Sequence, residues 1–465
     1  MRAWIDQALM AATDLPGADQ GCVVILTETY ETNVRWANNA LTTNGQMHHL
    51  KAQVVAMASV EGGTASGCLE GPVGSPEEVV ELVRQAALVA QAGTPDEDAH
   101  ELPAGTEDED FDTGAEATTF EVLAGVCEGL GRAFEQAGDK HLFFGFAEHI
   151  VHTTWLGTSS GSRRRSVARL GRLELNAKHP DMVGSAWVGR STADFSDIDM
   201  DGLVCEVLER LSWCENRLEL PAGRYEVILP PSAVSDLMIY AYWSMDGRSA
   251  REGQSVFAGK QPGSTRVGEQ FASLPLTMAS DPGVAGMECA PFAVAGSSRA
   301  GIMSVYDNGA TVGRTDWISR GVLRQLVETG YEVERSGQQP ATLPYPTGNL
   351  LLDGGGTATL DQMVASTKRG LLLTCLWYIR EVDPDTLLLT GLTRDGVYLV
   401  EDGKVVGAVN NFRWNESPVS LLGCMTELSA SERTLCREWN DWFQLTQAPA
   451  MRVPDFNMST VSQAS

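Results

Sequence analysis

The stretch DLMIYAYWSMDGRSAREGQSVFAGK, residues 236–260, decides how the C-terminal half of this sequence is interpreted. An apolar run leads into a loop punctuated by glycine, and the loop ends in a basic tail typical of a strand. The preceding Pro230-Pro231-Ser232 predicts the start of a helix with Ser232 as its N-cap. Apolar residues then recur at three- and four-residue spacing, which predicts a helix facing a core: Val234, Leu237, Met238, Ala241 and Met245. The stretch is shaped like the lining of an active site, yet it carries no obvious nucleophile, metal ligand or general base.

Length and charge restrict the class of protein. A chain of 465 residues is too long for one core, so we expect two domains. Its 61 acidic and 34 basic residues give a net charge of −27, which argues against nucleic acid or an anionic membrane as a partner. There is no apolar run of the roughly 20 residues needed to span a membrane, and the first 20 residues lack the apolar block of a signal peptide. We therefore expect a cytoplasmic protein, and nine cysteines without a CxxC pair fit reduced, mostly buried thiols.

The first half predicts a sheet backed by helices. Alternating apolar residues indicate strands at 22–30, 33–43 and 51–60, and two longer strands form a hairpin around Gly161. Ser75-Pro76-Glu77-Glu78 is typical of a helix start, and two further helices are predicted at 119–138 and 197–216. We place the end of this N-terminal α/β domain near Pro221, which gives a domain of residues 1–220.

The second half, residues 221–465, predicts a domain rich in strands. Within DGVYLVEDGKVVGAV, Asp402-Gly403 is a turn signal between two alternating strands, so a hairpin is expected there. Thr359 is placed to cap a short helix after the glycines at 354–356. The overall fold class is therefore α+β.

Two charged segments are interpreted as structural elements and not as binding sites. Arg163-Arg164-Arg165 is expected to be a solvated turn between strands, with phosphate binding as the minor alternative. Residues 94–118 form an acidic segment in which Asp108, Asp110 and Asp112 alternate with other residues, so a cation site is conceivable. The glycine turn and the distal glutamate of a calcium loop are missing, which favours a solvated connector.

Histidine usage excludes several chemistries. All seven histidines lie in the first 180 residues, so the C-terminal half contains neither a histidine-based triad nor a zinc site built on histidine. His149 and His152 face opposite sides of a predicted strand and would not bind one metal together. No GxSxG, HExxH or P-loop motif occurs. Two kinds of reactive group are not excluded by the sequence: carboxylates brought together by the fold, and the thiol of Cys424.

Several ordered segments resemble the TldD/TldE (TldD/PmbA) family of peptidase-complex proteins. They span nearly the whole chain and are RWANN (35–39) with TTNG (42–45), PAGRYEVIL (221–229), SVFAGK (255–260), LTMASDP (276–282), GNL (348–350) and GLTRDGVYLVEDGK (391–404). The resemblance implies an N-terminal α/β domain, a strand-rich C-terminal domain and a cytoplasmic paired assembly that degrades or trims unfolded peptides. In that assembly a TldD-type subunit carries a metal on a His-Glu-x-x-x-His helix, and its TldE-type partner lacks the motif.

The same resemblance aligns residues 238–243 with the metal motif. An ungapped register places Met238, Ile239 and Trp243 where the motif has His, Glu and His. Methionine sulfur is too soft for a hydrolytic zinc, while isoleucine and tryptophan offer no ligand. We therefore expect no metal cofactor in this chain and a zinc-type metal in a TldD-type partner.

The leading hypothesis is a TldE-type subunit that pairs with a TldD-type paralogue and binds unfolded peptide. The alternatives are an enzyme that hydrolyses an amide in a peptide or natural-product pathway, through acids or Cys424, and a peptide-binding adaptor without a peptidase partner. The candidate substrate contacts come from the tail after the vacated motif and from the early strands: Arg251, Ser255, Phe257, Gly259, Arg35, Asn38 and Asn39. Each of the seven also has a structural interpretation, since paired asparagines satisfy backbone groups and Gly259 can supply a bulge.

Overall fold

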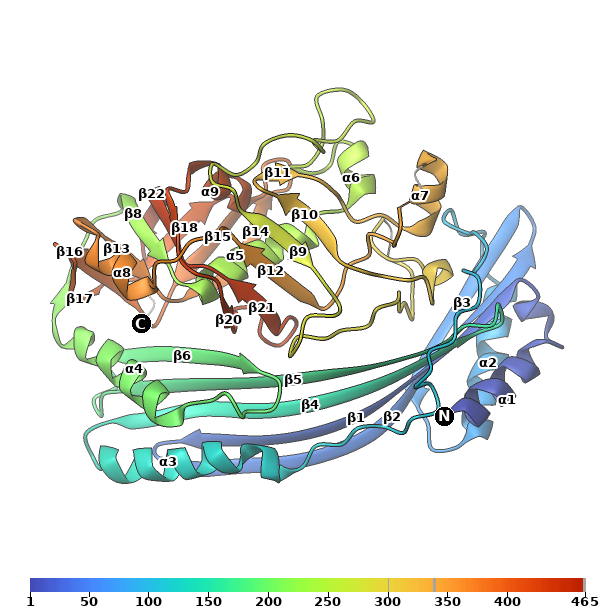
Figure 1. Ribbon diagram of the computed structural model, residues 1–465, viewed down its shortest axis with the longest axis horizontal. Helices are drawn as coiled ribbons and strands as arrows, with labels where there is room; N and C mark the ends of the chain where they lie inside the picture. The colour runs from blue at the N-terminus through green and yellow to red at the C-terminus, as the bar shows by residue number, and fades with distance from the viewer. Residues whose placement is uncertain (300, 338–339, 463–465) are drawn as a thin grey trace.

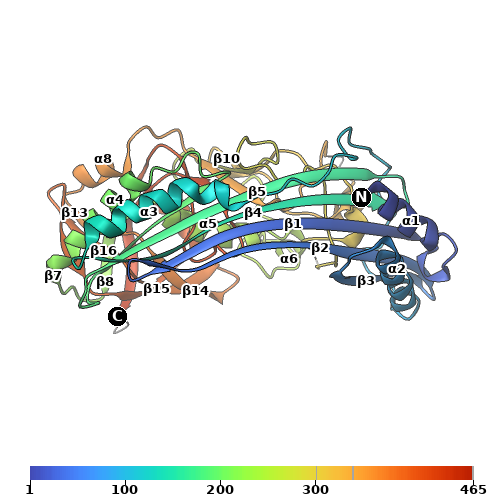
Figure 2. The ribbon, with the colours of Figure 1, turned by 90° about the horizontal axis from the view of Figure 1, so that it is seen from below.

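The N-terminal half forms one long antiparallel sheet in the computed structural model, which describes residues 1–299, 301–337 and 340–462 (Figure 1). Its strand order is β3-β2-β1-β4-β5-β6. The strands are β1 (Gly21–Ala37), β2 (Ala40–Val60), β3 (Gly63–Pro72), β4 (Leu142–Thr158), β5 (Arg163–Lys178) and β6 (Ser185–Thr192). Two pairs of helices cover the face turned away from the C-terminal half, one pair at each end (Figure 2). They are α1 (Arg2–Ala12) with α2 (Pro76–Gln91), and α3 (Ala124–Ala137) with α4 (Met200–Ser212).

The residues predicted as three short strands over 22–60 do form strands, but the predicted breaks are wrong, because the chain forms two long strands. β1 continues through Glu31 and Thr32, and it turns at Asn38-Asn39, where both residues have positive φ (51° and 59°). Such a turn suits asparagine, which tolerates the left-handed region. The predicted helix start at Ser75 is confirmed, since its hydroxyl accepts a hydrogen bond from the backbone N–H of Glu78. The hairpin around Gly161 is also confirmed.

The arginine run is not a solvated turn. It opens β5, and the side chains of Arg164 and Arg165 are buried in ion pairs with Asp108 and Asp110 of the acidic segment. That segment lies against the sheet as a strap, with Phe111 only 1% exposed. Asp108 and Asp110 neutralise these buried arginines, and Asp112 pairs with the partly exposed Arg2, so the segment is not the solvated connector predicted from its charge.

The C-terminal half contains two further sheets that enclose one helix. One sheet has the order β11-β10-β9-β12-β21-β20, and the other has β14-β15-β18-β22-β8-β13-β16-β17-β7 with β19 beside β22. The strands of the first sheet are β9 (Thr277–Ser280), β10 (Thr315–Ser319), β11 (Val322–Leu323), β12 (Asn349–Asp353), β20 (Glu432–Thr434) and β21 (Leu445–Ala448). Those of the second are β7 (Arg217–Leu218), β8 (Gly223–Leu229), β13 (Arg369–Leu373), β14 (Leu376–Asp383), β15 (Leu388–Thr393), β16 (Val397–Glu401), β17 (Lys404–Val409), β18 (Phe412–Glu416), β19 (Glu427–Leu428) and β22 (Met451–Val461).

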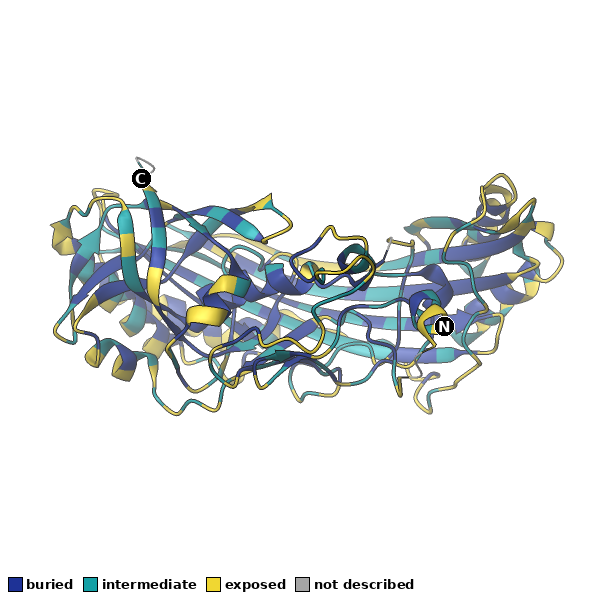
Figure 3. Ribbon diagram, turned by 90° about the horizontal axis from the view of Figure 1, so that it is seen from above, coloured by how far each residue is buried: buried dark blue, intermediate teal, exposed yellow. Residues whose placement is uncertain are grey.

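Helix α5 (Pro231–Trp243) is the centre of this half and contacts strands of both sheets. It begins at Pro231 with Pro230 as the N-cap, so the predicted cap at Ser232 is wrong. The expected core helix is confirmed, but its burial extends around the whole circumference rather than along one stripe, as in any helix that is apolar on all sides. The other helices are α6 (Gly247–Arg251), α7 (Gly330–Ser336), α8 (Leu360–Ala365) and α9 (Pro418–Cys424), and exposed residues gather mainly on loops and outer helix faces (Figure 3).

The predicted α+β class is confirmed, and the hairpin at Asp402-Gly403 and the Thr359 cap are present. The domain boundary near Pro221 stays a prediction. The chain leaves the first sheet after β6, and after α4 the short strand β7 already pairs with β17 before that proline is reached. None of the described helices is long and apolar enough to cross a membrane.

A histidine–aspartate contact joins the two halves of the chain. His100 of the strap hydrogen-bonds through Nε2 to Asp307 Oδ1 at 3.1 Å, and its Nδ1 donates to the Asp98 carbonyl at 2.8 Å. Burial alone would lower the pKa of His100, but these hydrogen bonds and the charge of Asp307 outweigh it and raise the pKa above its ordinary value. The protonated form is therefore favoured by folding.

We expect this contact to stabilise the fold in acid more than in base. Because the folded-state pKa is raised, the contribution is fully present below about pH 6.5 and is lost as the pH rises through the folded pKa. His100→Gln should lower the free energy of unfolding more at pH 5.5 than at pH 8.5, by on the order of 1 kcal/mol in urea titrations. His48→Gln, at a half-exposed histidine, is the control. An equal effect of H100Q at both pH values would contradict the assignment.

Candidate functional site

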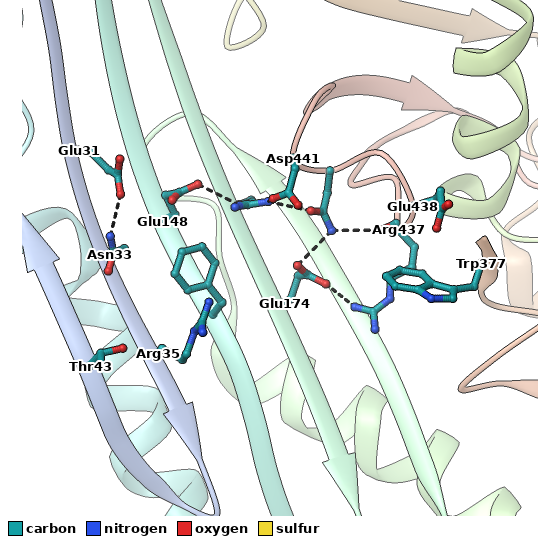
Figure 4. A pocket seen from close by; sticks show the side chains of 13 residues that line it. Glu31, Asn33, Arg35, Thr43, Glu148, Glu174, Trp377, Arg437, Glu438 and Asp441 are labelled. Atoms are coloured by element: carbon teal, nitrogen blue, oxygen red, sulfur yellow. Dashed lines mark hydrogen bonds and ion pairs between the residues drawn. The ribbon is translucent and has the colours of Figure 1, made fainter. Parts of the chain in front are cut away.

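A polar cleft of about 600 Å³ lies where the concave face of the long sheet meets the loop 437–441 between β20 and β21 (Figure 4). We call it the central cleft. Its lining residues come from β1, β2, β4 and β5 on one side and from β14 and the loop on the other: Glu31, Asn33, Arg35, Thr43, Phe146, Glu148, Arg172, Glu174, Trp377, Arg437, Glu438, Asn440 and Asp441.

The floor of the cleft follows from the two-residue period of the strands. Arg35 pairs in register with Thr43 on one side and Phe146 on the other, and Phe146 pairs with Glu174. The adjacent row on the same face is Asn33, Glu148 and Arg172. Intervening residues such as Val34 and Trp36 point to the opposite face, into the core beneath α3 and α4. Two consecutive rows of polar and aromatic side chains therefore cross the sheet.

The loop is held to this floor by charged hydrogen bonds. Arg172 donates to Glu148 at 3.0 Å, to Asn440 Oδ1 at 2.7 Å and to Asp441. Arg437 donates to Glu174, and its guanidinium lies 4.8 Å from the ring centre of Trp187 on β6. Such charge-assisted contacts fix the geometry of the loop as well as its position.

The other end of the loop is held by α5. Both carboxylate oxygens of Asp236 accept backbone N–H groups, from Glu438 at 2.9 Å and Arg437 at 3.1 Å, and the indole of Trp439 donates to the Asp236 carbonyl at 3.0 Å. Asp236 is fully buried, and burial raises its pKa well above the ordinary value despite these donors. The cleft wall is thus anchored directly to the core helix.

Two carboxyls in the cleft have perturbed acidity. Burial raises the pKa of Glu148, and the charge of Arg172 opposes that shift. Burial likewise raises the pKa of Glu438, against the N–H groups of Ile379 and Tyr378 that its carboxylate accepts. Carboxyls of this kind suit proton transfer or recognition of a polar ligand. By contrast Arg35 lies over Phe146 at 5.3 Å and forms no ion pair with any described residue, so its donors are available to a ligand.

The vacated motif positions do not reach the cleft. Met238 and Ile239 have no exposed surface and pack in the core around α5. Trp243, at the end of the helix, is 38% exposed and packs its ring against Trp439 with 5.2 Å between ring centres. Its side chain belongs to an aromatic cluster beside the loop.

The residues around α5 do not fit a metal ion. Met238, Ile239 and Trp243 supply no hydrolytic ligand set, and the oxygens of Asp236 are already occupied by backbone donors. No group of three or more His, Cys, Asp or Glu residues in the described part of the chain is arranged to bind a metal.

The structure separates the seven predicted contacts. Arg35 lines the central cleft. Asn38 and Asn39 form the β1–β2 turn, where Asn39 accepts the N–H of Phe143 at 2.7 Å and donates to the His141 carbonyl at 2.8 Å, a structural role. Arg251 lies elsewhere, ion-paired to Glu328 and Glu332.

The remaining three candidates lie in the loop that follows α6, the helix that ends at Arg251. Ser255 accepts the N–H of Phe257, and Phe257 is buried and stacked on Phe271. A side chain at Gly259 would approach Ser264 Oγ to 2.2 Å, so the close passage of the chain requires glycine there.

Cys424 lacks the surroundings of an activated nucleophile. Its thiol donates to the Leu421 carbonyl, and burial, followed by Glu416 and Asp455, raises its pKa. A reactive thiol needs the opposite shift.

The family comparisons agree with this architecture. Residues 222–460, just over half of the chain, match the family described as the PmbA/TldA metallopeptidase C-terminal domain. This chain belongs to the TldD/PmbA family. The resemblance predicted from the sequence is therefore confirmed. No curated protein matches this TldD/PmbA chain significantly.

Solved structures with the same fold align with this chain over almost its entire length. TldE from Thermococcus kodakarensis has a TM-score of 0.75 at 16% identity and covers 98% of this chain and 99% of its own. A protein from Thermotoga maritima described as a candidate modulator of a DNA gyrase has a TM-score of 0.73 at 16% identity, with 98% and 99% covered. One from Bacteroides thetaiotaomicron, described similarly, has 0.73 at 15%, with 99% of both chains covered.

We expect Asp236→Ala to release the loop 437–441 from the core helix. Two buried N–H groups would lose their acceptor, so the free energy of unfolding should fall by about 2–4 kcal/mol in urea titrations. Asp201→Ala removes an exposed carboxylate of α4 paired with Arg132 and should change it by no more than about 0.5 kcal/mol. Wild-type stability in D236A would show that the anchoring is unimportant.

Proposed function

We propose that this chain is a TldE-type subunit without metal, which pairs with a metal-bearing TldD-type paralogue and presents unfolded peptide to it. The main observation behind the proposal is that α5 carries core side chains at the positions of the metal motif. The helix aligned with the metal motif is filled with core side chains, while a polar cleft is built on the loop that its Asp236 anchors. The metal and the hydrolytic step belong to the partner in this proposal, and the complex works in the cytoplasm.

A bare strand edge beside the cleft supports peptide binding. β3 pairs with β2 only from Lys51 onward, so no described strand pairs with the outer edge of residues 40–50. Thr43 of this edge lines the cleft. An extended peptide adds to such an edge through main-chain hydrogen bonds and places alternate side chains into the neighbouring space. The arginines, carboxylates and aromatic rings of the cleft would then contact those side chains.

Reconstitution tests the division of labour. The purified chain alone should hold no zinc in elemental analysis and cleave no unfolded peptide, and peptidase activity should arise on mixing with a TldD-type paralogue. Stoichiometric zinc with turnover by this chain alone would overturn the proposal in favour of an autonomous amide hydrolase. Native purification without any TldD-type chain would instead favour a peptide-binding adaptor.

Arg35→Gln tests the cleft itself. Removing the unpaired guanidinium from the cleft should raise KM of the reconstituted complex for unfolded peptide by about three- to tenfold, the loss expected for one charge-assisted hydrogen bond, and leave kcat nearly unchanged. Arg84→Gln on the outer face of α2 is the matched control. An unchanged KM in R35Q would place the peptide elsewhere.

A further inference from the structure

Two charged side chains on the floor of the central cleft have no oppositely charged partner. The other charged residues of the lining are all engaged in ion pairs: Arg172 with Glu148 and Asp441, Arg437 with Glu174, and Glu438 with Arg380. Glu31 and Arg35, both on β1, form no ion pair with any residue that the structure describes (Figure 4). Of the charges in the cleft, these two are therefore available to a ligand.

Each of the two charges is oriented by an uncharged neighbour. The carboxylate of Glu31 accepts a hydrogen bond from the side-chain amide of Asn33 at 2.7 Å. The guanidinium of Arg35 lies 5.3 Å from the ring centre of Phe146. A guanidinium over an aromatic ring keeps its orientation and still has N–H donors free at its edge. Both side chains are thus positioned before a ligand arrives, which lowers the entropic cost of binding.

The charge of Glu31 is not neutralised inside the free protein. Burial is the main cause of the raised pKa of Glu148, and the charge of Arg172 opposes that shift, but the charge of Glu31 adds to it. Two carboxylates that repel each other in this way favour a bound cation beside them. Glu31 pairs in register with Met47, whose side chain is 51% exposed. The apolar stem of a lysine or arginine packs on such a surface while its charged end meets the carboxylate.

The spacing of the two charges matches the repeat of an extended chain. Glu31 and Arg35 lie on one face of β1 four residues apart, which places their Cα atoms about 13 Å from each other at the rise of a strand. An extended peptide has the same rise and turns every second side chain to the same side. Its residues i and i+4 therefore match the two charges, whereas its residues i and i+3 point to opposite sides.

A peptide added at the bare edge of β2 lies close enough for these contacts. Neighbouring strands are about 4.8 Å apart, so β1 is about 10 Å from an added strand, with β2 between them. The β2 residue beside Arg35 is the small Thr43, which leaves the path to the edge open. Two long side chains that extend toward each other span this distance, and two short ones do not. The matching residues of the peptide are therefore lysine or arginine opposite Glu31 and glutamate opposite Arg35.

We propose that the central cleft selects extended peptide segments in which a basic residue and a glutamate are separated by three residues. The basic side chain pairs with Glu31 and the glutamate pairs with Arg35, and their order in the peptide follows from the direction in which it runs along β2. The inference rests on the proposed function, because it names the class of unfolded peptide that the cleft presents.

Three fluorescein-labelled peptides of identical composition test the spacing by fluorescence anisotropy, with the isolated chain and with the reconstituted complex. Two have the four-residue spacing in either order, Gly-Ser-Lys-Thr-Ser-Thr-Glu-Ser-Gly and Gly-Ser-Glu-Thr-Ser-Thr-Lys-Ser-Gly, and the third has a three-residue spacing, Gly-Ser-Lys-Thr-Ser-Glu-Thr-Ser-Gly. The tighter of the first two should bind about three- to tenfold more tightly than the third, the gain expected for one charge-assisted contact.

Reduced and amidomethylated α-lactalbumin, an unfolded chain, separates failure of this inference from failure of the proposed function. If it binds while the three peptides bind equally or not at all, the charge spacing is overturned and peptide presentation stands. If neither it nor any peptide binds below about 1 mM, both are overturned.

Charge reversal assigns each contact to its side chain. Relative to the wild-type chain, Arg35→Glu should shift the preference by about tenfold toward a peptide with two lysines, Gly-Ser-Lys-Thr-Ser-Thr-Lys-Ser-Gly, and Glu31→Lys should shift it equally toward the same peptide with two glutamates. Neither variant breaks an ion pair of the free protein, so folding should be unaffected. Arg84→Glu, on the outer face of α2, is the matched control and keeps the wild-type preference. An unchanged preference in both R35E and E31K overturns the assignment.

Discussion

The buried carboxylate of Asp236 is the contact on which the rest of the C-terminal half depends. It lies on a helix that is apolar on every side, and it accepts two backbone N–H groups of a loop some 200 residues further along the chain. A buried carboxylate is tolerated where donors surround it, and here those donors belong to the wall of the central cleft. Two sheets, a helix and a polar surface are thereby fixed relative to one another. The apolar replacement of the metal motif on the same helix leaves this scaffold intact.

The N-terminal sheet positions its part of the central cleft through the alternation of side chains between the two faces of its strands. One set of side chains packs beneath α3 and α4, and the alternate set forms the floor of the cleft. Because both sets come from the same strands, the core and the polar surface share one register. A slip of one residue would exchange them, so burial of Val34 and Trp36 also holds Arg35 and Asn33 in the cleft.

Local patterns predicted much of this fold and little of the site. Ser75, Thr359 and Asp402-Gly403 carry their signals within a few residues, and each does what its pattern indicates. β22 was missed because Pro454 and Asp455 interrupt its alternation, and a register irregularity between Val453 and Phe456 accommodates them. Arg35, a candidate from the family motif, lies in the central cleft. Glu148, Arg172 and Glu174 were missed, although the alternation of polar and apolar residues in β4 and β5 was a usable signal. The loop 437–441 has no such pattern, since its partners are distant in sequence.

The bare edge of β2 has a consequence for the life of the molecule in the cell. No described strand covers the backbone groups on the outer edge of residues 40–49, and the side chains of Leu41 and Met47 are exposed there. The segment contains no proline, and histidine is its only potentially charged residue. Natural sheets normally protect such edges with proline, lysine or a covering segment, because an open edge invites other chains to pair with it. An uncovered copy is therefore exposed to self-association and to the quality-control machinery. Selection would then favour synthesis of this chain in step with whatever covers that edge.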